Sequence, residues 1–305
     1  MSFGTNNGTG VGTNKFVPYG MNMRDKFEFY TFYITTQILK RLPYKFVIVI
    51  IKTLFYIAGI GIGIRKKVIT SQLKLCFPNK TVKEINNLTR AIYNELAITC
   101  AEVFVFDENY FNNKIELVNF EELDKALTLG RGAIIVSAHF GNWEIGAKLI
   151  AKKHSEVWGI VKSIRNKMFN NYIEDQRQKQ GIRTVEMKSA LKKIISALDK
   201  NKVVAILVDQ YAAKQGVEMN FMGHNTKVYT SVAQIAIKYK TPIIPAFDIR
   251  DKDGKHKYIF HEAIIINDEN TDTIELTRHI NSFIEEYITK YPQLWFWLNR
   301  KWRSS

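Results

Sequence analysis

The sequence has few cysteines and lacks several motifs that would fix its class. Its two cysteines, Cys76 and Cys100, form no C-x-x-C pair, which argues against a disulfide framework or a zinc site and suits a reducing compartment. No G-x4-G-K-[ST] or G-x-S-x-G stretch occurs, so neither a phosphate loop nor a serine nucleophile is indicated. No basic segment followed by a short apolar core and a cleavage site opens the chain, so we expect no secretory signal.

Acidic residues are also in deficit. Lys and Arg number 44 against 29 Asp and Glu, which gives a formal net charge of +15. Such a surplus favours an anionic partner, such as membrane lipid, nucleic acid, or an acidic protein or cofactor. Because no nucleic-acid-binding motif is found and an apolar stretch lies near the amino terminus, we expect a membrane surface as partner and no nucleic acid.

Composition divides the chain into three parts. Residues 1–23, rich in Gly, Asn and Thr, are predicted to form a flexible tail. Residues 24–67 are aromatic and apolar and are predicted to form a helical segment that associates with a membrane. Residues 68–305 are predicted to form one folded domain, since their length suffices for a full core.

The apolar segment favours a helical hairpin over a single span. Pro43 interrupts it, and the nineteen residues 46–64 contain Lys52, whereas a span needs about twenty apolar residues and a charge at its centre costs a few kcal/mol. Basic residues on both flanks would hold both ends at the cytoplasmic side of one leaflet. A buried core helix is the alternative interpretation.

Beyond this segment, apolar runs alternate with helical patterns. Thr81 and Glu84 form a capping box that starts a helix predicted to reach Phe106. We expect strands at 115–118, 133–138, 157–161, 203–208, 242–247 and 258–266, and further helices at 121–129, 144–153, 167–180, 188–199, 228–239 and 272–290. The stretch 68–77 is predicted to be the end of a helix, and 211–225 a polar loop. The alternation predicts an α/β fold with a mixed, mostly parallel sheet flanked by helices.

The most informative stretch is AIIVSAHFGNWEIGAK, residues 133–148. His139 follows the buried strand 133–138, Gly141 and Asn142 form a turn, and Glu144 opens the next helix. Catalytic groups collect at strand ends of open α/β sheets. A nearby carboxylate can hold one imidazole nitrogen and leave the other free to take a proton from a hydroxyl. The alternative is a core histidine bonded to a backbone carbonyl.

Other polar residues are expected at the same sheet edge. Asp209 follows the buried strand 203–208, and Lys162 and Arg165 follow strand 157–161. Nine Lys and Arg crowd into residues 162–193, which would suit a substrate that carries phosphate or carboxylate, although a solvated basic surface has the same composition. No second histidine stands four residues after His139, so no metal site is predicted.

A series of blocks resembles a known family from about Lys40 to Trp302. In order, these are RLP, LKLCFP, SAHFGNWE, Asn166, RQKQG, VDQ, FMG, TPIIP and the closing P-x-x-W-x-W-x-x-R-x-W. Their order and spacing resemble the bacterial lipid A biosynthesis acyltransferases of lauroyl and myristoyl type, in the lysophospholipid acyltransferase-like superfamily. The phosphatidylinositol mannoside acyltransferases are related to them.

The resemblance implies that residues 68–305 form an acyltransferase domain. In it, His139 is the general base on an acceptor hydroxyl and Glu144 its orienting partner. The hydroxyl attacks the thioester of an acyl carrier protein or acyl-CoA, with no covalent enzyme intermediate and no other cofactor. The acceptor is a glycolipid such as a lipid A precursor at the cytoplasmic face of the inner membrane. The remaining matched positions imply substrate contacts by Lys162, Asn166, Arg177, Asp209, Gln210 and Gly223.

The chain departs from the family pattern in places. Lys162 stands where arginine is usual, which keeps the charge but loses bidentate phosphate contact. Ser71 and Gln72 replace a common Asn-Leu pair, and Asn299 replaces a common histidine. A different phospholipid, aminolipid or mannoside acceptor therefore stays open, as does a non-catalytic protein that binds membranes peripherally.

Overall fold

A seven-stranded sheet organises the computed structural model, which describes residues 22–303 except residues 112 and 269. The strand order is β1 (Ile115–Val118), β9 (His256–Phe260), β8 (Ile243–Arg250), β2 (Ala133–Ser137), β5 (Val203–Leu207), β3 (Val157–Val161) and β4 (Ile182–Glu186). Only β8 and β9 pair antiparallel, so the predicted mixed, mostly parallel sheet is confirmed. Of the predicted tail, residues 1–21 lie outside the described residues.

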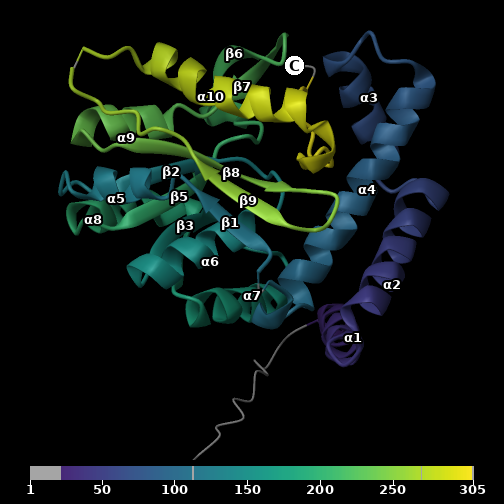
Figure 1. Cartoon of the computed structure of the whole chain (residues 1–305). Helices are drawn as coiled ribbons and strands as arrows, with labels where there is room; N and C mark the ends of the chain where they lie inside the picture. Colours follow the sequence, from purple (N-terminus) through teal and green to yellow (C-terminus); the bar gives the residue numbers. More distant parts are fainter. Residues whose placement is uncertain (1–21, 112, 269, 304–305) are drawn as a thin grey trace, which may run out of the picture.

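Helices cover both faces of the sheet. On one face lie α5 (Glu121–Leu127) and α6 (Trp143–His154), with α7 (Lys167–Lys179) beyond them. On the other lie α8 (Ala190–Asp199), α9 (Ser231–Tyr239) and α10 (Thr273–Lys290) (Figure 1). Strand β2 sends Ile134 and Val136 to the second face and Ile135 to the first. Burial on both faces explains its uninterrupted apolar sequence.

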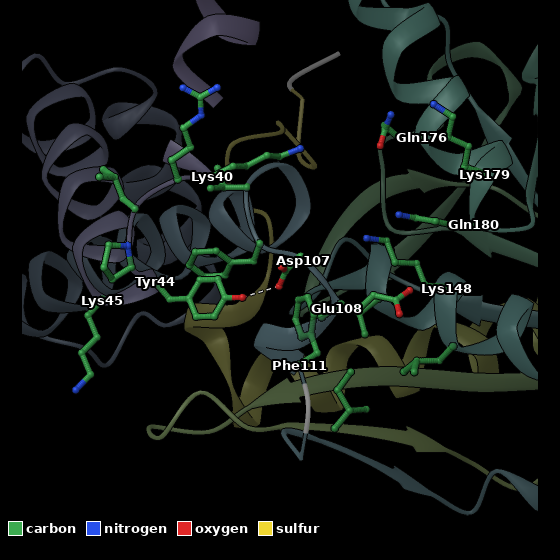
Figure 2. Close-up of a pocket in the computed structure, with 18 of the residues that line it drawn as sticks. Lys40, Tyr44, Lys45, Asp107, Glu108, Phe111, Lys148, Gln176, Lys179 and Gln180 are labelled. Carbon is green, nitrogen blue, oxygen red and sulfur yellow. Dashed lines mark hydrogen bonds between the residues drawn. The ribbon is translucent and has the colours of Figure 1, made fainter. Parts of the chain in front are cut away.

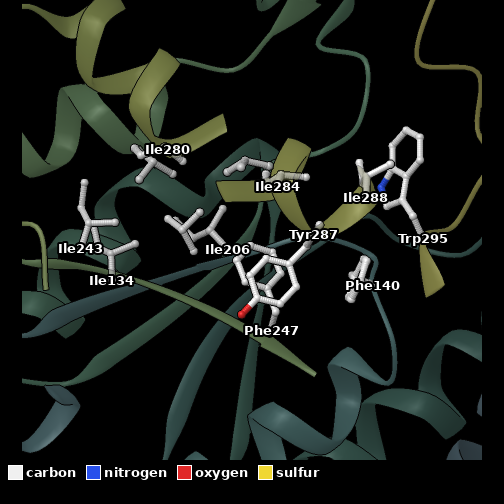
Figure 3. Close-up of a cluster of buried hydrophobic side chains, with 14 of the residues drawn as sticks. Ile134, Phe140, Ile206, Ile243, Phe247, Ile280, Ile284, Tyr287, Ile288 and Trp295 are labelled. Atoms are coloured by element: carbon white, nitrogen blue, oxygen red, sulfur yellow. The ribbon is translucent and has the colours of Figure 1, made fainter. Parts of the chain in front are cut away.

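The larger core lies between the sheet and α10. Ile280, Ile284 and Ile288 of α10 pack over strand side chains such as Ile134 and Ile206, as Figure 3 shows. Phe140, Phe247, Tyr287 and Trp295 extend this core beneath the loop that follows β2 (Figure 3). The carboxyl edge of β2 therefore has a rigid aromatic support.

The long helix α4 (Val82–Phe104) flanks the sheet and carries the N-terminal helices (Figure 1). The predicted capping box of Thr81 and Glu84 is confirmed at its start. Helices α1 (Met23–Leu39) and α2 (Tyr44–Tyr56) are separated at Pro43, as expected, and α2 continues as a π-helical turn, Ile57–Gly61. Apolar residues of α2, such as Val47 and Ile51, pack on Ala97 and Ala101 of α4.

The other side of α2 is exposed and apolar. Within the described residues, Tyr44–Gly61 is the one helix long and apolar enough to cross a membrane, with a mean hydropathy of 1.7 and 17% of it buried. That evidence comes from length and composition alone. Lys52 lies near Glu95 of α4, where its charge opposes the rise that burial causes in the pKa of Glu95. Lys52, which interrupts the apolar run, therefore lies on the side of α2 that faces α4, where its charge is kept from lipid.

Four segments differ from the expectation. The strand expected at 258–266 begins two residues earlier and ends at Phe260, as β9. Residues 182–186, for which no strand is predicted, form edge strand β4, which buries only Ile182 and Val185. The expected polar loop 211–225 contains most of a hairpin, β6 (Val217–Phe221) and β7 (His224–Val228), whose inward positions are apolar or Thr while the outward ones are polar. The stretch expected to end a helix belongs to a whole helix, α3 (Lys66–Cys76).

Candidate active site

The register of two neighbouring strands places His139 beside Asp209. Strands β2 and β5 are parallel, with Ser137 opposite Leu207, and each polar residue follows two positions later. The Nδ1–H of His139 donates to Oδ1 of Asp209 at 2.8 Å. The expectation that both side chains share the carboxyl edge of the sheet is confirmed.

The carboxylate that holds the imidazole is that of Asp209, and the expectation for Glu144 is corrected. At the start of α6, Glu144 faces α7, where its Oε1 accepts from Nη2 of Arg177 at 2.5 Å. Arg177 also pairs with Glu174 at 3.2 Å. The turn at Gly141 and Asn142 directs Glu144 away from the ring. Glu144 acts on His139 only through its charge, which helps to raise the pKa of the imidazole.

Both oxygens of Asp209 are occupied. Its Oδ2 accepts a hydrogen bond of 2.8 Å from the indole N–H of Trp295, opposite the bond with His139. Burial by itself would raise the pKa of Asp209, but His139, the Trp295 N–H and the charge of Lys301 outweigh burial and lower it. The carboxylate is thus held ionised although its residue is only 3% exposed.

The same balance acts on the imidazole. Burial lowers the pKa of His139, but the charge and hydrogen bond of Asp209, together with the field of Glu144, outweigh burial and raise it. With the Nδ1 proton given to Asp209, the neutral ring carries its lone pair on Nε2. The His139 side chain is 20% exposed, so the ring is not sealed in the interior.

Gln210 and two aromatic rings surround the free side of His139. Nε2 of the exposed Gln210 amide lies 3.2 Å from Nε2 of His139, so the amide N–H can donate to the lone pair. The rings of Trp143 and Phe296 lie 5.2 and 6.1 Å from the imidazole. A backbone hydrogen bond of 2.9 Å, from the N–H of Phe296 to the carbonyl of His139, fixes the Phe296 segment beside the His139 loop.

Sequence reasoning missed Lys301. This residue is 1% exposed, and its Nζ donates to the carbonyl of Gln210 at 3.3 Å and lies 4.6 Å from the centre of the Phe221 ring. Burial lowers its pKa to about 8, while the charges of Asp209 and Glu285 oppose the change. Lys301 belongs to the closing aromatic block of the sequence, but nothing in that block indicated a contact with Gln210, 91 positions earlier.

The loop that carries His139 rests on buried polar groups. Gly141 has φ +56°, and a Cβ there would lie 2.3 Å from the carbonyl oxygen of Asp248, so this position requires glycine. Asn142 N–H donates to Oδ2 of Asp248 at 2.7 Å, and its side-chain amide donates to Glu102 at 2.9 Å. The turn after His139 is therefore fixed from beneath.

Two cations balance these two acids. His256 bonds to Asp248 at 3.0 Å and to Glu102 at 3.2 Å, and Arg250 reaches Glu102 at 3.1 Å. Burial lowers the pKa of His256, but hydrogen bonds to the two carboxylates outweigh burial and raise it to about 9. Protonated His256 and Arg250 thus offset the charges of Glu102 and Asp248, and Arg250 also pairs with Glu95 at 2.6 Å. Among the described residues, no group of three His, Cys, Asp or Glu could hold a metal ion.

The remaining site candidates are dispersed. Lys162 is exposed after β3, at the same sheet edge as His139. Asn166 caps α7, accepting from Met168 N–H at 3.1 Å, and donates to the carbonyl of Asp25 in α1. Gly223 has φ +81° in the β6–β7 turn. The structure brings together His139, Asp209 and Gln210, and it gives Asn166 and Gly223 clear local roles in the backbone.

Comparison with known proteins agrees with the arrangement of the blocks. A family model described as bacterial lipid A biosynthesis acyltransferase matches residues 21–304. A phosphatidylinositol mannoside acyltransferase of Mycolicibacterium smegmatis is 19% identical over 71% of this chain and 73% of its own. The lipid A biosynthesis palmitoleoyltransferase and lauroyltransferase of Escherichia coli are 20% and 21% identical, each over 79% of both chains.

Proposed function

The chain belongs to the family of bacterial lipid A biosynthesis acyltransferases, and we propose that it transfers a fatty acyl chain from an acyl thioester to a hydroxyl of a glycolipid. The observation that carries this proposal is the hydrogen bond of 2.8 Å between His139 and Asp209 at a partly open sheet edge. It leaves one imidazole nitrogen free to act as a general base.

In the proposed reaction, the acceptor hydroxyl adds to the carbonyl carbon of the thioester and the thiolate then leaves. Nε2 of His139 takes the proton of the acceptor hydroxyl while the hydroxyl oxygen attacks the thioester carbonyl. The C–S bond then breaks, and the thiolate that leaves receives the proton from the imidazolium. Asp209 stays ionised throughout, because its hydrogen bonds and neighbouring charges keep its pKa low, and it stabilises the imidazolium.

Gln210 is proposed to contact the substrate. The acceptor hydroxyl must occupy the position beside His139 Nε2 where the amide of Gln210 now lies at 3.2 Å. Gln210 is exposed and can move aside while its N–H stays within reach of a substrate oxygen. Lys162, at the same edge, is proposed to meet a negatively charged part of the substrate.

The pair Glu144 and Arg177 is proposed to position the helices around this site. Its ion pair links the start of α6, which follows His139, to α7. Burial lowers the pKa of Arg177, but Glu144 and Glu174 outweigh burial and raise it, so the guanidinium stays charged. The arrangement supports a positioning role for Glu144 rather than direct contact with the imidazole.

The donor is proposed to be an acyl carrier protein or acyl-CoA, and the acceptor a lipid A precursor. An acidic carrier suits a chain of net charge +15. Relatives named for lauroyl and palmitoleoyl transfer in lipid A biosynthesis support this acceptor, while others named for a phosphatidylinositol mannoside support a different sugar lipid. The exposed apolar face of α2 supports attachment to a membrane, and we propose the cytoplasmic face of the inner membrane as its site.

A transfer assay with each donor tests the proposal. Purified protein is incubated with an acylated acyl carrier protein or with acyl-CoA, each radiolabelled in its acyl chain, and with a bacterial lipid extract. The labelled lipids are then identified by mass spectrometry. We expect label in a sugar lipid ester. If neither donor gives an acylated lipid, the chain is a peripheral membrane-binding protein and the proposal is rejected. Label in a phospholipid or aminolipid alone would reject the glycolipid acceptor.

A further inference from the structure

A large cleft in the described part of the chain lies apart from the His139 loop. It has a volume of about 1290 Å³, and neither His139 nor Asp209 lines it. Figure 2 shows Lys40, Tyr44 and Lys45 on one side of it and Lys148 and Lys179 on the other. The first group comes from the α1–α2 turn, defined as residues 40–45 so that it includes the first two residues of α2, and the second group comes from α6 and α7.

Apolar side chains form the floor of this cleft. Phe106 follows the end of α4, Phe111 ends the short 3-10 helix Glu108–Phe111, and Ile145 and Leu149 come from α6. The α1–α2 turn is held over this floor because Tyr44 donates its hydroxyl proton to Asp107 at 2.5 Å and packs on the ring of Phe106. These contacts fix the position of the α1–α2 turn, and the apolar floor lines the cleft where a ligand can contact it.

The rim of the cleft is strongly basic. Two acids, Asp107 and Glu108, stand among six cations: Lys40, Arg41, Lys45, Lys148, Lys152 and Lys179. Lys179 pairs with Asp175. Within residues 22–303 as described, no carboxylate lies within 4.0 Å of the other five cations. Unpaired cations around an apolar floor match a ligand that has an anionic head and an apolar tail.

The position of the cleft identifies where such a ligand would come from. Phe46 lines the cleft and begins the exposed apolar face of α2, on which Val49 and Leu54 are 62% and 54% exposed. A surface of this kind lies at the boundary between lipid head groups and acyl chains. The turn that carries Lys40, Arg41 and Lys45 would then lie at head-group level.

We propose that this cleft binds an anionic phospholipid, with the phosphate between the Lys40 side and the Lys148 and Lys179 side and an acyl chain on Phe106 and Leu149. The bound lipid is an anchor, not a reactant. The site therefore does not depend on the proposed transfer reaction, and it adds recognition of one lipid class to the general attraction of a basic chain for an anionic membrane.

Native mass spectrometry of the full chain in a non-ionic detergent tests the site. The protein is mixed with equal amounts of phosphatidylglycerol and phosphatidylcholine, and the bound lipid is counted. We expect one retained phosphatidylglycerol, preferred about 30- to 150-fold, the range expected if two or three lysines contact the phosphate at about 1 kcal/mol each. A triple variant, Lys40→Gln, Lys152→Gln and Lys179→Gln, should lose the preference, and Lys148→Gln alone should weaken it about fivefold.

The matched control removes three charges elsewhere. Lys192→Gln, Lys193→Gln and Lys200→Gln change exposed residues at α8 and should keep the preference. Thermal unfolding confirms that each variant folds. Equal losses in both triple variants would show that only overall charge acts and would overturn the site. Equal retention of the two lipids would show that the cleft does not select an anionic head group, and this too would overturn the site. It would also be overturned if inorganic phosphate displaced the lipid at equal concentration, or if the cleft variants lost binding of the acidic carrier protein and not of lipid.

Discussion

Replacing Asp209 by asparagine tests which acid supports the imidazole. The two oxygens of Asp209 accept one hydrogen bond each, from His139 Nδ1–H and Trp295 Nε1–H, both at 2.8 Å. An asparagine has one oxygen and one NH₂ group, so it can accept only one of these bonds. Its NH₂ group must then face a donor or force the imidazole proton onto Nε2, the nitrogen that the reaction needs free.

The expected loss of rate is about 10²- to 10⁴-fold, the range for a general base that is lost or held in the wrong tautomer. The pH profile gives a second readout. Because the charge of Asp209 is the main influence raising the pKa of His139, its removal should shift the acidic limb of the residual activity to lower pH. Unfolding should cost about 1–3 kcal/mol less, the value of one unsatisfied buried donor.

The measurement is the transfer rate from a labelled acyl thioester across a range of pH, with melting curves of each variant. Asp124→Asn is the control, since Asp124 pairs with His154 at 3.2 Å on the surface and should change neither rate nor pH profile. Glu144→Gln should shift the acidic limb less than Asp209→Asn does. A larger shift in Glu144→Gln, or a full rate in Asp209→Asn, would refute the reasoning.

Three further outcomes follow from the same contacts. The folded-state pKa of His256, about 9, lies above its ordinary value of 6.5. Protonated His256 therefore stabilises the fold fully below pH 6.5, and this stabilisation is lost as the pH rises through 9. In denaturant titrations, His256→Gln should reduce the loss of unfolding free energy between these pH values by about 3 kcal/mol. Gly141→Ala, with φ +56° and a Cβ 2.3 Å from the Asp248 carbonyl oxygen, should cost about 1–3 kcal/mol of stability and lower the transfer rate. Polar replacement of Leu54 and Ile57, each at least half exposed, should weaken vesicle flotation, whereas complete release of the unaltered chain by high salt would contradict an embedded hairpin.

The sequence predicted those parts of the fold in which the pattern is local. The strand 133–138, the capping box at Thr81 and the break at Pro43 depend on residues within a few positions of one another, and all three are present. Strand β4 escaped prediction because this edge strand buries only Ile182 and Val185, which gives neither an apolar run nor an alternating pattern. The β6–β7 hairpin escaped because its polar outer face is typical of a loop.

The site was predicted in its location and not in its pairing. Placement of His139 and Asp209 at one edge follows from parallel strands, and the register then brings them into contact. Glu144, the partner predicted for His139 from its spacing and from the family resemblance, does not contact the ring, because the start of a helix fixes the direction of its side chains and this one points to Arg177. The contacts of Trp295 and Lys301 join segments about 90 residues apart, which no local pattern encodes.

The transfer rate of a His139→Ala variant tests the central claim most directly. It should be compared with the unaltered chain at equal amounts of vesicle-bound protein, so that membrane attachment does not enter the result. We expect the rate to fall at least about 10²-fold while the melting temperature and vesicle binding stay unchanged. A variant that transfers acyl chains at the original rate would contradict the assignment of His139 as the base.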